Sequence, residues 1–98
     1  MAATLLTPSQ CEALPQQLPA WQLLNGKLHR DIRFADFSEA FAFMVRVAMV
    51  AESLGHHPEW SNVWNRVSID LTTHDLGGLS SLDLALAQQI DNFLAKKP

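Results

Sequence analysis

The sequence predicts an α+β fold: a two-layer sandwich in which a four-stranded antiparallel sheet carries its helices packed on one face. Three observations predict it. Helical periodicity occurs near both ends and in the middle of the chain, strand-like alternation lies between these segments, and no repeat or Gly/Ser-rich linker divides the sequence. With 98 residues, 48% of them hydrophobic, the chain can build one core, so we expect residues 1–98 to form a single domain.

The first elements are a short helix and a hairpin. An N-cap, a proline at the first helical position and a glutamine that can reach back to the cap predict the helix start at Thr7, Pro8 and Gln10. We expect this helix to end near Leu14, before Pro15. Residues 21–25 and 28–34 then predict two strands that turn at Gly26-Lys27, because the second segment alternates between apolar and polar side chains.

The middle of the chain predicts one long helix. Asp36 and Glu39 form a capping box, the helical pattern runs from Phe37 to Leu54, and Gly55 is the C-cap. One face is expected in the core: Phe37, Ala40, Phe41, Phe43, Met44, Val47, Ala48, Val50, Ala51 and Leu54. The opposite face is polar except for Ala42, Val45 and Met49. These three indicate either a surface for a partner chain or apolar side chains left in water.

The C-terminal part predicts two more strands and a last helix. Residues 60–64 and 67–72 have strand character with Asn65-Arg66 as a tight turn, although one long bent strand also fits. A glycine-containing loop over residues 73–79 follows. Ser80, with Asp83 three residues on, begins the last helix. Its buried stripe is Leu82, Leu86, Ile90, Phe93 and Leu94, and its C-terminal dipole is favoured by Lys96 and Lys97.

Charge and cysteine content argue against several classes of protein. Seven Lys and Arg against ten Asp and Glu give a net charge of -3, and the basic residues are scattered, so direct nucleic-acid binding is not expected. The single cysteine, Cys11, cannot form an internal disulfide, which favours a reducing compartment. With no basic leader and no long apolar run, we expect a cytoplasmic protein that does not enter a membrane.

Three of the four histidines fall in two short loops at predicted strand ends, where a rigid scaffold displays reactive groups. His56 and His57 follow the C-cap of the long helix, and His74 follows a strand end with Asp75 beside it. An imidazole has an ordinary pKa of about 6.5 and can both donate and accept a proton near neutrality. The cluster therefore suggests acid-base chemistry.

Other interpretations stay open for the histidines. His29 shares a strand face with charged side chains and is expected to be a surface or structural residue. The His56-His57 pair can instead cap carbonyl groups at the end of the long helix. A zinc site formed by three histidines and Asp75 is disfavoured, because neighbours in an extended segment point to opposite sides and Pro58 favours extended geometry at His57. We therefore expect no metal.

Asp83 and Trp60 each have two interpretations. Asp83 projects from the apolar side of the last helix, where a carboxylate needs a partner, but it is also the N3 residue of a capping box at the positive end of the helix dipole. Trp60, close to the histidine pair, either stacks on a planar ligand or belongs to the core.

Four segments form a specific pattern: Glu52-Ser53-Leu54-Gly55-His56-His57-Pro58-Glu59-Trp60, Trp64-Asn65-Arg66-Val67, Leu71-Thr72-Thr73-His74-Asp75, and Gly78-Leu79-Ser80 with Asp83. With it, the chain strongly resembles the pterin-4a-carbinolamine dehydratase family. The likeness extends to Trp21, the Gly26 turn and the long helix, and only the N-terminal segment looks generic. Trp64 departs from the tyrosine that is common there, so a hydrogen bond from that hydroxyl is absent.

The resemblance implies a hydro-lyase that dehydrates 4a-hydroxytetrahydropterin to quinonoid dihydropterin and water, without a metal or redox cofactor. This step recycles the pterin of aromatic amino acid hydroxylases. The residues that correspond to the family's catalytic set are His56, His57, His74 and Asp83. The residues expected to bind the pterin or frame its pocket are Pro58, Trp60, Thr73 and Asp75. We expect His56 to be the main proton-transfer group, His74 the second and His57 to position the pterin ring.

The resemblance also implies partners. Family members are homodimers or homotetramers joined by sheet edges and by the long helix, which agrees with the exposed Val45 and Met49, and a functional link to an aromatic amino acid hydroxylase is expected. Animal members also act as transcriptional coactivators, a role that nothing in this chain indicates. The alternative function is a non-catalytic oligomeric interaction or regulatory module of the same fold.

Overall fold

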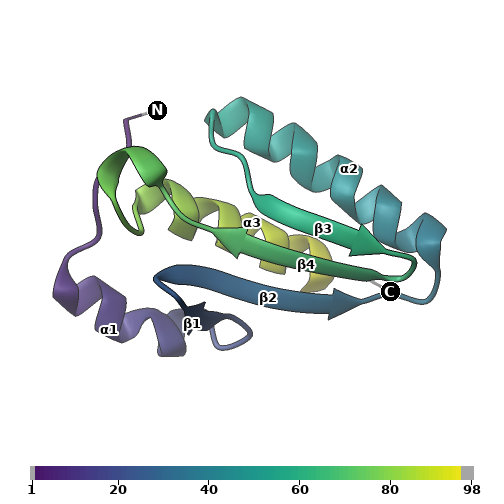
Figure 1. Cartoon of the computed structure of the whole chain (residues 1–98), viewed down its shortest axis with the longest axis horizontal. Coiled ribbons are helices and arrows are strands. Elements are labelled where there is room, and N and C mark those ends of the chain that lie inside the picture. The colour runs from purple at the N-terminus through teal and green to yellow at the C-terminus, as the bar shows by residue number, and fades with distance from the viewer. Residues whose placement is uncertain (1, 96–98) are drawn as a thin grey trace.

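A computed structural model of the chain describes residues 2–95. Its elements are α1 (Pro8–Gln17), β1 (Gln22–Leu24), β2 (Lys27–Arg33), α2 (Phe37–Leu54), β3 (Glu59–Val63), β4 (Arg66–Leu71), the single 3-10 turn η1 (His74–Leu76) and α3 (Ser81–Ala95). The strands form one antiparallel sheet in the order β1-β2-β4-β3, with α2 and α3 against one face (Figure 1). The predicted α+β sandwich is therefore confirmed.

The core lies between the sheet and these two helices. β4 supplies three fully buried side chains, Val67, Ile69 and Leu71, at the alternating positions that face the helices. From the helices, Val47, Leu86 and Ile90 have no exposed surface. Leu82 is also buried and Phe93 and Leu94 are partly buried, so the predicted stripe of α3 is confirmed, while Lys96 and Lys97 lie outside the described residues. Within residues 2–95, no helix is both long and apolar enough to cross a membrane.

Both hairpins turn one residue earlier than the sequence analysis indicated. In the first, the turn is Asn25-Gly26, with Leu24 paired to Lys27. Both turn residues have positive φ, 54° and 75°, which matches the right-handed twist of the strands. Asparagine and glycine tolerate that conformation better than Gly26-Lys27 would.

The second hairpin turns at Trp64-Asn65, with Val63 paired to Arg66. Asn65 is buried, and its side-chain amide is satisfied by a 2.9 Å hydrogen bond that it donates to the Phe34 carbonyl. Its own carbonyl accepts from the Phe34 N–H at 2.8 Å. This anchor fixes the turn and leaves Trp64 in the left-handed region at φ 52°, which is strained for a bulky side chain.

The expected end of α1 was wrong. The capping box of Thr7 and Gln10 is present, but the helix continues through Pro15 to Gln17. Pro15 has no backbone N–H, so the helix loses one hydrogen bond there. The last turn is closed by the Leu18 N–H, which donates to the Leu14 carbonyl at 2.7 Å. Both leucines are buried in the core, at 2% and 3% exposure, which holds this turn in place.

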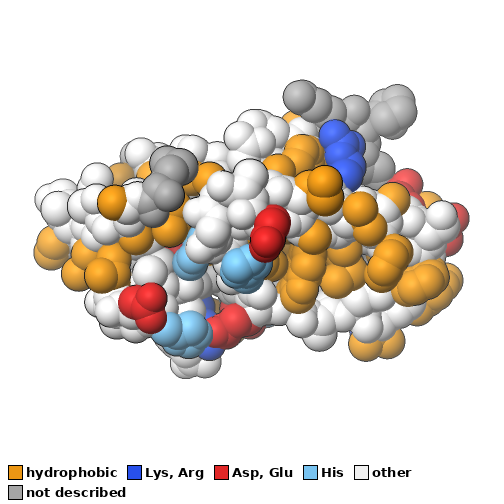
Figure 2. Space-filling model, turned by 90° about the horizontal axis from the view of Figure 1, so that it is seen from above, with side chains coloured by type: hydrophobic (Ala, Val, Ile, Leu, Met, Phe, Trp, Pro, Cys, Tyr) orange, Lys and Arg blue, Asp and Glu red, His pale blue; other side chains and the backbone are white. Residues whose placement is uncertain are grey.

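The long helix α2 has the predicted bounds but a narrower buried face. Asp36 caps the Glu39 N–H, whereas the Glu39 carboxylate accepts from Ala35 rather than from the cap. Phe37, Phe41 and Ala48, expected in the core, are exposed, because the sheet covers only the side that carries Ala40, Phe43, Val47 and Ala51. We call Phe37, Phe41, Val45 and Met49 the α2 stripe; they recur every four residues and are 48–70% exposed (Figure 2).

Candidate active site

Two histidines, His56 and His57, directly follow the C-cap of α2. Gly55 adopts φ 66° and its N–H bonds to the carbonyls of Ala51 and Glu52, and the His56 N–H also bonds to the Ala51 carbonyl. Backbone groups therefore close the helix, and the imidazoles are left for other partners. The His57 ring bonds to the Glu52 carboxylate at 2.9 Å, in an exposed pair.

Asp83 is the partner of His56. Its Oδ1 lies 2.6 Å from His56 Nε2, and its side chain has no exposed surface. Its Oδ2 accepts from the Thr73 hydroxyl at 2.7 Å and from the Ser80 N–H at 2.9 Å. The carboxylate therefore caps α3 and holds the imidazole at once, so both interpretations from the sequence describe the same side chain. We call His56, Asp83, Thr73 and Ser80 the Asp83 cluster.

With the Asp83 carboxylate ionised, the hydrogen bonds of the Asp83 cluster define the proton positions. An ionised carboxylate only accepts hydrogen bonds, so Thr73 donates to it and can in turn accept from the Ser80 hydroxyl, 2.6 Å away. His56 must then donate through Nε2, which leaves Nδ1 as the ring nitrogen for other chemistry. The ring is 11% exposed, so it is reachable but firmly held.

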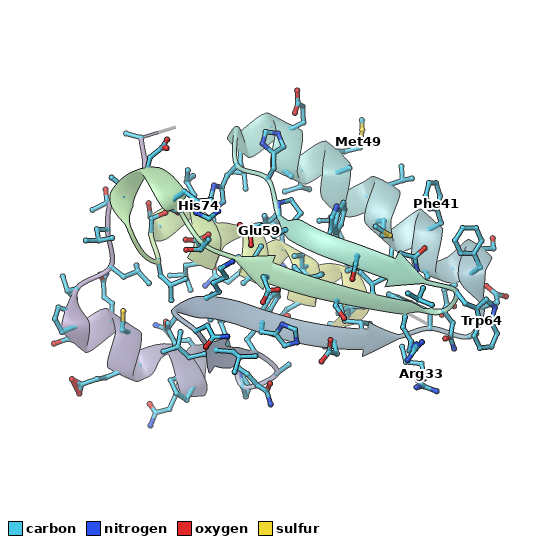
Figure 3. The ribbon with its side chains drawn as sticks, in the orientation of Figure 1. Arg33, Phe41, Met49, Glu59, Trp64 and His74 are labelled. Atoms are coloured by element: carbon cyan, nitrogen blue, oxygen red, sulfur yellow. The ribbon has the colours of Figure 1, made fainter. Side chains whose placement is uncertain are left out.

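His74 belongs to the opposite side of the sheet. The alternation of β4 continues to buried Thr73, whose backbone pairs with Gly78, and His74 comes next, at the start of η1. Its Nε2 bonds to the Glu59 carboxylate (Figure 3), and its side chain is 72% exposed. Thr73 and His74 are consecutive, so the residue that carries the exposed imidazole directly follows a member of the Asp83 cluster.

Glu59 and Lys27 form a hydrogen-bond network with His74 that the sequence analysis did not predict. The Glu59 carboxylate bonds to Lys27 Nζ at 2.6 Å through one oxygen and to His74 through the other. The hydrogen bond from Lys27 lowers the pKa of Glu59, and the hydrogen bond from His74 lowers it further. The hydrogen bond to Glu59 raises the pKa of Lys27. Glu59 directly follows the His-His-Pro motif, and strand alternation could have placed it on the open face of the sheet, but its partners come from other elements.

The remaining predicted residues have different surroundings. Trp60 pairs with Ile69 across the strands and packs against the core, partly buried. Pro58 is partly buried, and Asp75 is exposed with no hydrogen bond or ion pair to any described residue. Hydrogen bonds do not join the three imidazoles to one another in residues 2–95, although histidine side chains gather left of the centre of the surface in Figure 2. No three His, Cys, Asp or Glu side chains in that range could hold a metal ion.

Two cavities lie away from this site. One, of about 580 Å³, opens on the uncovered face of the sheet and is lined by Asp31, Ile32, Arg33, Ser61, Val63, Arg66, Val67 and Ser68. The other, of about 200 Å³, lies beside Phe43 and Phe93. None of the predicted site residues lines either of these two cavities.

The chain is similar to known proteins over nearly its whole length. The family model described as Pterin 4 alpha carbinolamine dehydratase matches residues 4–93. A protein of Synechococcus sp. (strain WH7803) is 63% identical over 89 residues, which cover 91% of this chain and 96% of the relative. One of Solibacter usitatus (strain Ellin6076) is 49% identical over 92 residues, covering 94% and 97%. Both carry the provisional name pterin-4-alpha-carbinolamine dehydratase.

The fold has a solved counterpart. A crystal structure from Brucella melitensis, described as a transcriptional coactivator/pterin dehydratase, matches with a TM-score of 0.85 and 40% sequence identity. The match covers 91% of this chain and 97% of that one. Sequence and fold therefore agree on the same relatives.

Proposed function

This chain belongs to the pterin-4-alpha-carbinolamine dehydratase family, a family of hydro-lyases, and on that premise we propose that its histidines dehydrate a 4a-hydroxytetrahydropterin by acid-base catalysis. The reaction breaks the bond between C4a and its hydroxyl oxygen and removes the proton from N5, so that a C4a–N5 double bond forms and water leaves. One group must therefore donate a proton and another must accept one. The quinonoid dihydropterin that results is at the same oxidation level, so the balance needs no oxidant or reductant.

The Asp83 cluster is the observation that carries the proposal. A general acid or base works when its ring is held and one nitrogen faces the substrate. Asp83 binds Nε2 of His56, which leaves Nδ1 to exchange a proton with the pterin. Thr73 and Ser80 hold that carboxylate in turn, so the imidazole has a fixed orientation. Nothing else in residues 2–95 combines a reachable imidazole with a fully buried carboxylate.

The other histidines take supporting roles in this proposal. His74, whose Nε2 is occupied by Glu59, presents Nδ1 as the second proton-transfer group or as a contact for the departing hydroxyl. His57, with its exposed ring, positions the pterin. Pro58, Trp60, Thr73 and Asp75 are proposed to frame the pocket around it. Trp60 supports this least directly, because its ring packs against the core.

The experiment is a direct rate measurement. Freshly made 4a-hydroxytetrahydropterin is followed by its absorbance decay with and without the protein. The proposal expects decay to accelerate in proportion to protein concentration. A rate equal to the uncatalysed one would leave the alternative, a non-catalytic interaction or regulatory module, as the better account.

We also propose that the chain assembles as a homodimer or homotetramer through the α2 stripe. Four large apolar side chains in one row, with Met49 70% exposed, form a surface that water does not favour. Sheet edges are the second proposed contact. The alternative function, a non-catalytic interaction module, would use the same exposed stripe to bind a partner. The Brucella protein is described as a transcriptional coactivator as well as a pterin dehydratase.

The free cysteine bears on the cellular setting. We infer a reducing compartment, the cytoplasm, from the single free Cys11. A functional link to an aromatic amino acid hydroxylase follows from the proposed reaction, because that class of enzyme produces the 4a-hydroxypterin.

A further inference from the structure

We propose that Glu59 and Lys27 are positioning residues that hold His74 as its Nε2–H tautomer and present its Nδ1 to the pterin; this inference rests on the proposed function. The two residues come from different strands, β3 and β2, which flank β4 in the sheet. Their ion pair crosses the strand whose continuation carries His74. The uncovered face of the sheet thus contributes to a site whose other half lies at the helix ends.

His74 needs such support more than His56 does. It starts a single 3-10 turn, and its side chain is 72% exposed, so packing alone does not fix its ring. A free imidazole exchanges between two tautomers, and only one of them leaves Nδ1 unprotonated. A carboxylate beside Nε2 selects the tautomer with the proton on that nitrogen, because a carboxylate accepts hydrogen bonds and does not donate them.

Lys27 makes Glu59 a better support. Lys27 binds the other carboxylate oxygen at 2.6 Å, so each oxygen of Glu59 has its own partner and the carboxylate is fixed by two hydrogen bonds. The ammonium group also keeps the carboxylate ionised to lower pH, since it lowers the pKa of Glu59. Glu59 is 41% exposed and Lys27 34%, so neither is needed for the core.

The variant Glu59→Gln gives a sharp test. Lys27 can only donate, so it claims the amide oxygen, and the amide NH2 then faces His74. The imidazole nitrogen beside it has to accept, and the proton moves to Nδ1. At a pH where the His74 imidazole is neutral, we expect its ring ¹⁵N shifts to change from those of mainly the Nε2–H tautomer to those of mainly the Nδ1–H tautomer. The matched control is Glu12→Gln, which makes the same change on an exposed residue of α1.

The kinetic expectation follows from the same change. With 4a-hydroxytetrahydropterin, we expect Glu59→Gln to lower kcat about tenfold with KM little changed, less than the about 10²- to 10⁴-fold that an acid-base group itself contributes. Lys27→Met acts through Glu59, so the double variant is expected to be no slower than Glu59→Gln alone. Glu12→Gln keeps the rate of the unmodified chain.

The outcomes separate this inference from the proposed function. A tautomer ratio that is the same in Glu59→Gln and Glu12→Gln would overturn the positioning role, whatever the rates are. A changed ratio with an unchanged kcat would overturn the catalytic importance of the tautomer. If the unmodified protein does not accelerate dehydration, the proposed function fails, while the ¹⁵N shifts still decide whether Glu59 orients His74.

Discussion

The imidazole of His56 and the carboxylate of Asp83 lie 2.6 Å apart, although 27 positions separate them in the sequence. Asp83 also accepts the Ser80 N–H that begins α3. The residue that caps a helix is therefore the residue that orients the imidazole, and helix stability and site geometry depend on one buried side chain. This sharing makes changes at Asp83 informative, because they act on both properties.

Replacing Asp83 by Asn is expected to lower stability and kcat together. Asparagine can keep an oxygen toward Thr73 and Ser80 but then turns its NH2 group toward His56, so the hydrogen bonds to a charged carboxylate become weaker neutral ones, which costs about 1 to 3 kcal/mol in free energy of unfolding. Urea unfolding and dehydration rates measure the two effects. Asp91→Asn is the control, since Asp91 on the same helix bonds to Arg30 and Trp21 and its loss is expected to reduce stability alone. Equal kcat losses in the two variants would contradict the role given to Asp83.

His29 gives the protein a predictable dependence of stability on pH. Its ring contacts the Asp31 and Asp70 carboxylates, and hydrogen bonds to them raise its pKa above 6.5. A raised folded-state pKa stabilises fully below the unfolded-state value, and that contribution is lost as pH rises through the folded-state pKa. We expect the stability difference between the unmodified protein and His29→Gln to be largest near pH 5.5 and to shrink toward pH 9. Urea unfolding across this range measures it, and a difference that grows with pH would contradict the assignment.

Asp31 sets the acid side of the same network. The Ser68 hydroxyl, and then His29, lowers the pKa of Asp31 below 3.8. Its stabilisation is therefore present above pH 3.8 and lost as pH falls through the lowered value. Asp31→Asn is expected to remove that acid-side loss, as measured by unfolding between pH 2 and 5. An identical acid profile in the variant would show that other carboxyl groups dominate.

The α2 stripe predicts an assembly that a charge disrupts. Size exclusion with light scattering is expected to give more than one 10.9 kDa chain per particle at micromolar concentration. Met49→Glu places a carboxylate in the row and is expected to shift the protein to monomers, because burying an unpaired charge is costly. Ser38→Glu adds the same charge on an exposed polar position of α2 as the control. A particle mass unaffected by Met49→Glu would move the interface elsewhere.

Removal of metal ions is expected to leave the activity intact. In the proposed reaction the described side chains carry both protons, and no step is assigned to a metal. Dialysis against a chelator, followed by the same absorbance assay, checks this. Activity that is lost on dialysis and restored by a divalent ion would return the zinc interpretation.

Local patterns predicted most of the fold. The caps of α1 and α2 and the alternation of β4 are properties of a few neighbouring residues, and the structure confirms them. What failed depends on contacts between distant segments. The helix passes Pro15 because Leu18 is buried, the second turn shifts because Asn65 binds Phe34, and Phe41 is exposed because the sheet does not reach that side of α2.

The site divides in the same way. The sequence placed Asp83 on the apolar side of α3 and left two interpretations open, and only the fold brings His56 to it. Glu59 was within the motif but had no role, because the partners that give it one arrive from β2 and from the turn after β4. Pairing across a sheet is not visible in a single strand.

The most direct test of the central claim is kcat/KM for dehydration by His56→Ala, measured beside His29→Ala, which removes an imidazole outside the proposed site. Far-UV circular dichroism establishes that both variants are folded. We predict that His56→Ala loses at least about tenfold in kcat/KM while His29→Ala keeps the rate of the unmodified protein. An unchanged kcat/KM in folded His56→Ala would contradict proton transfer by this imidazole.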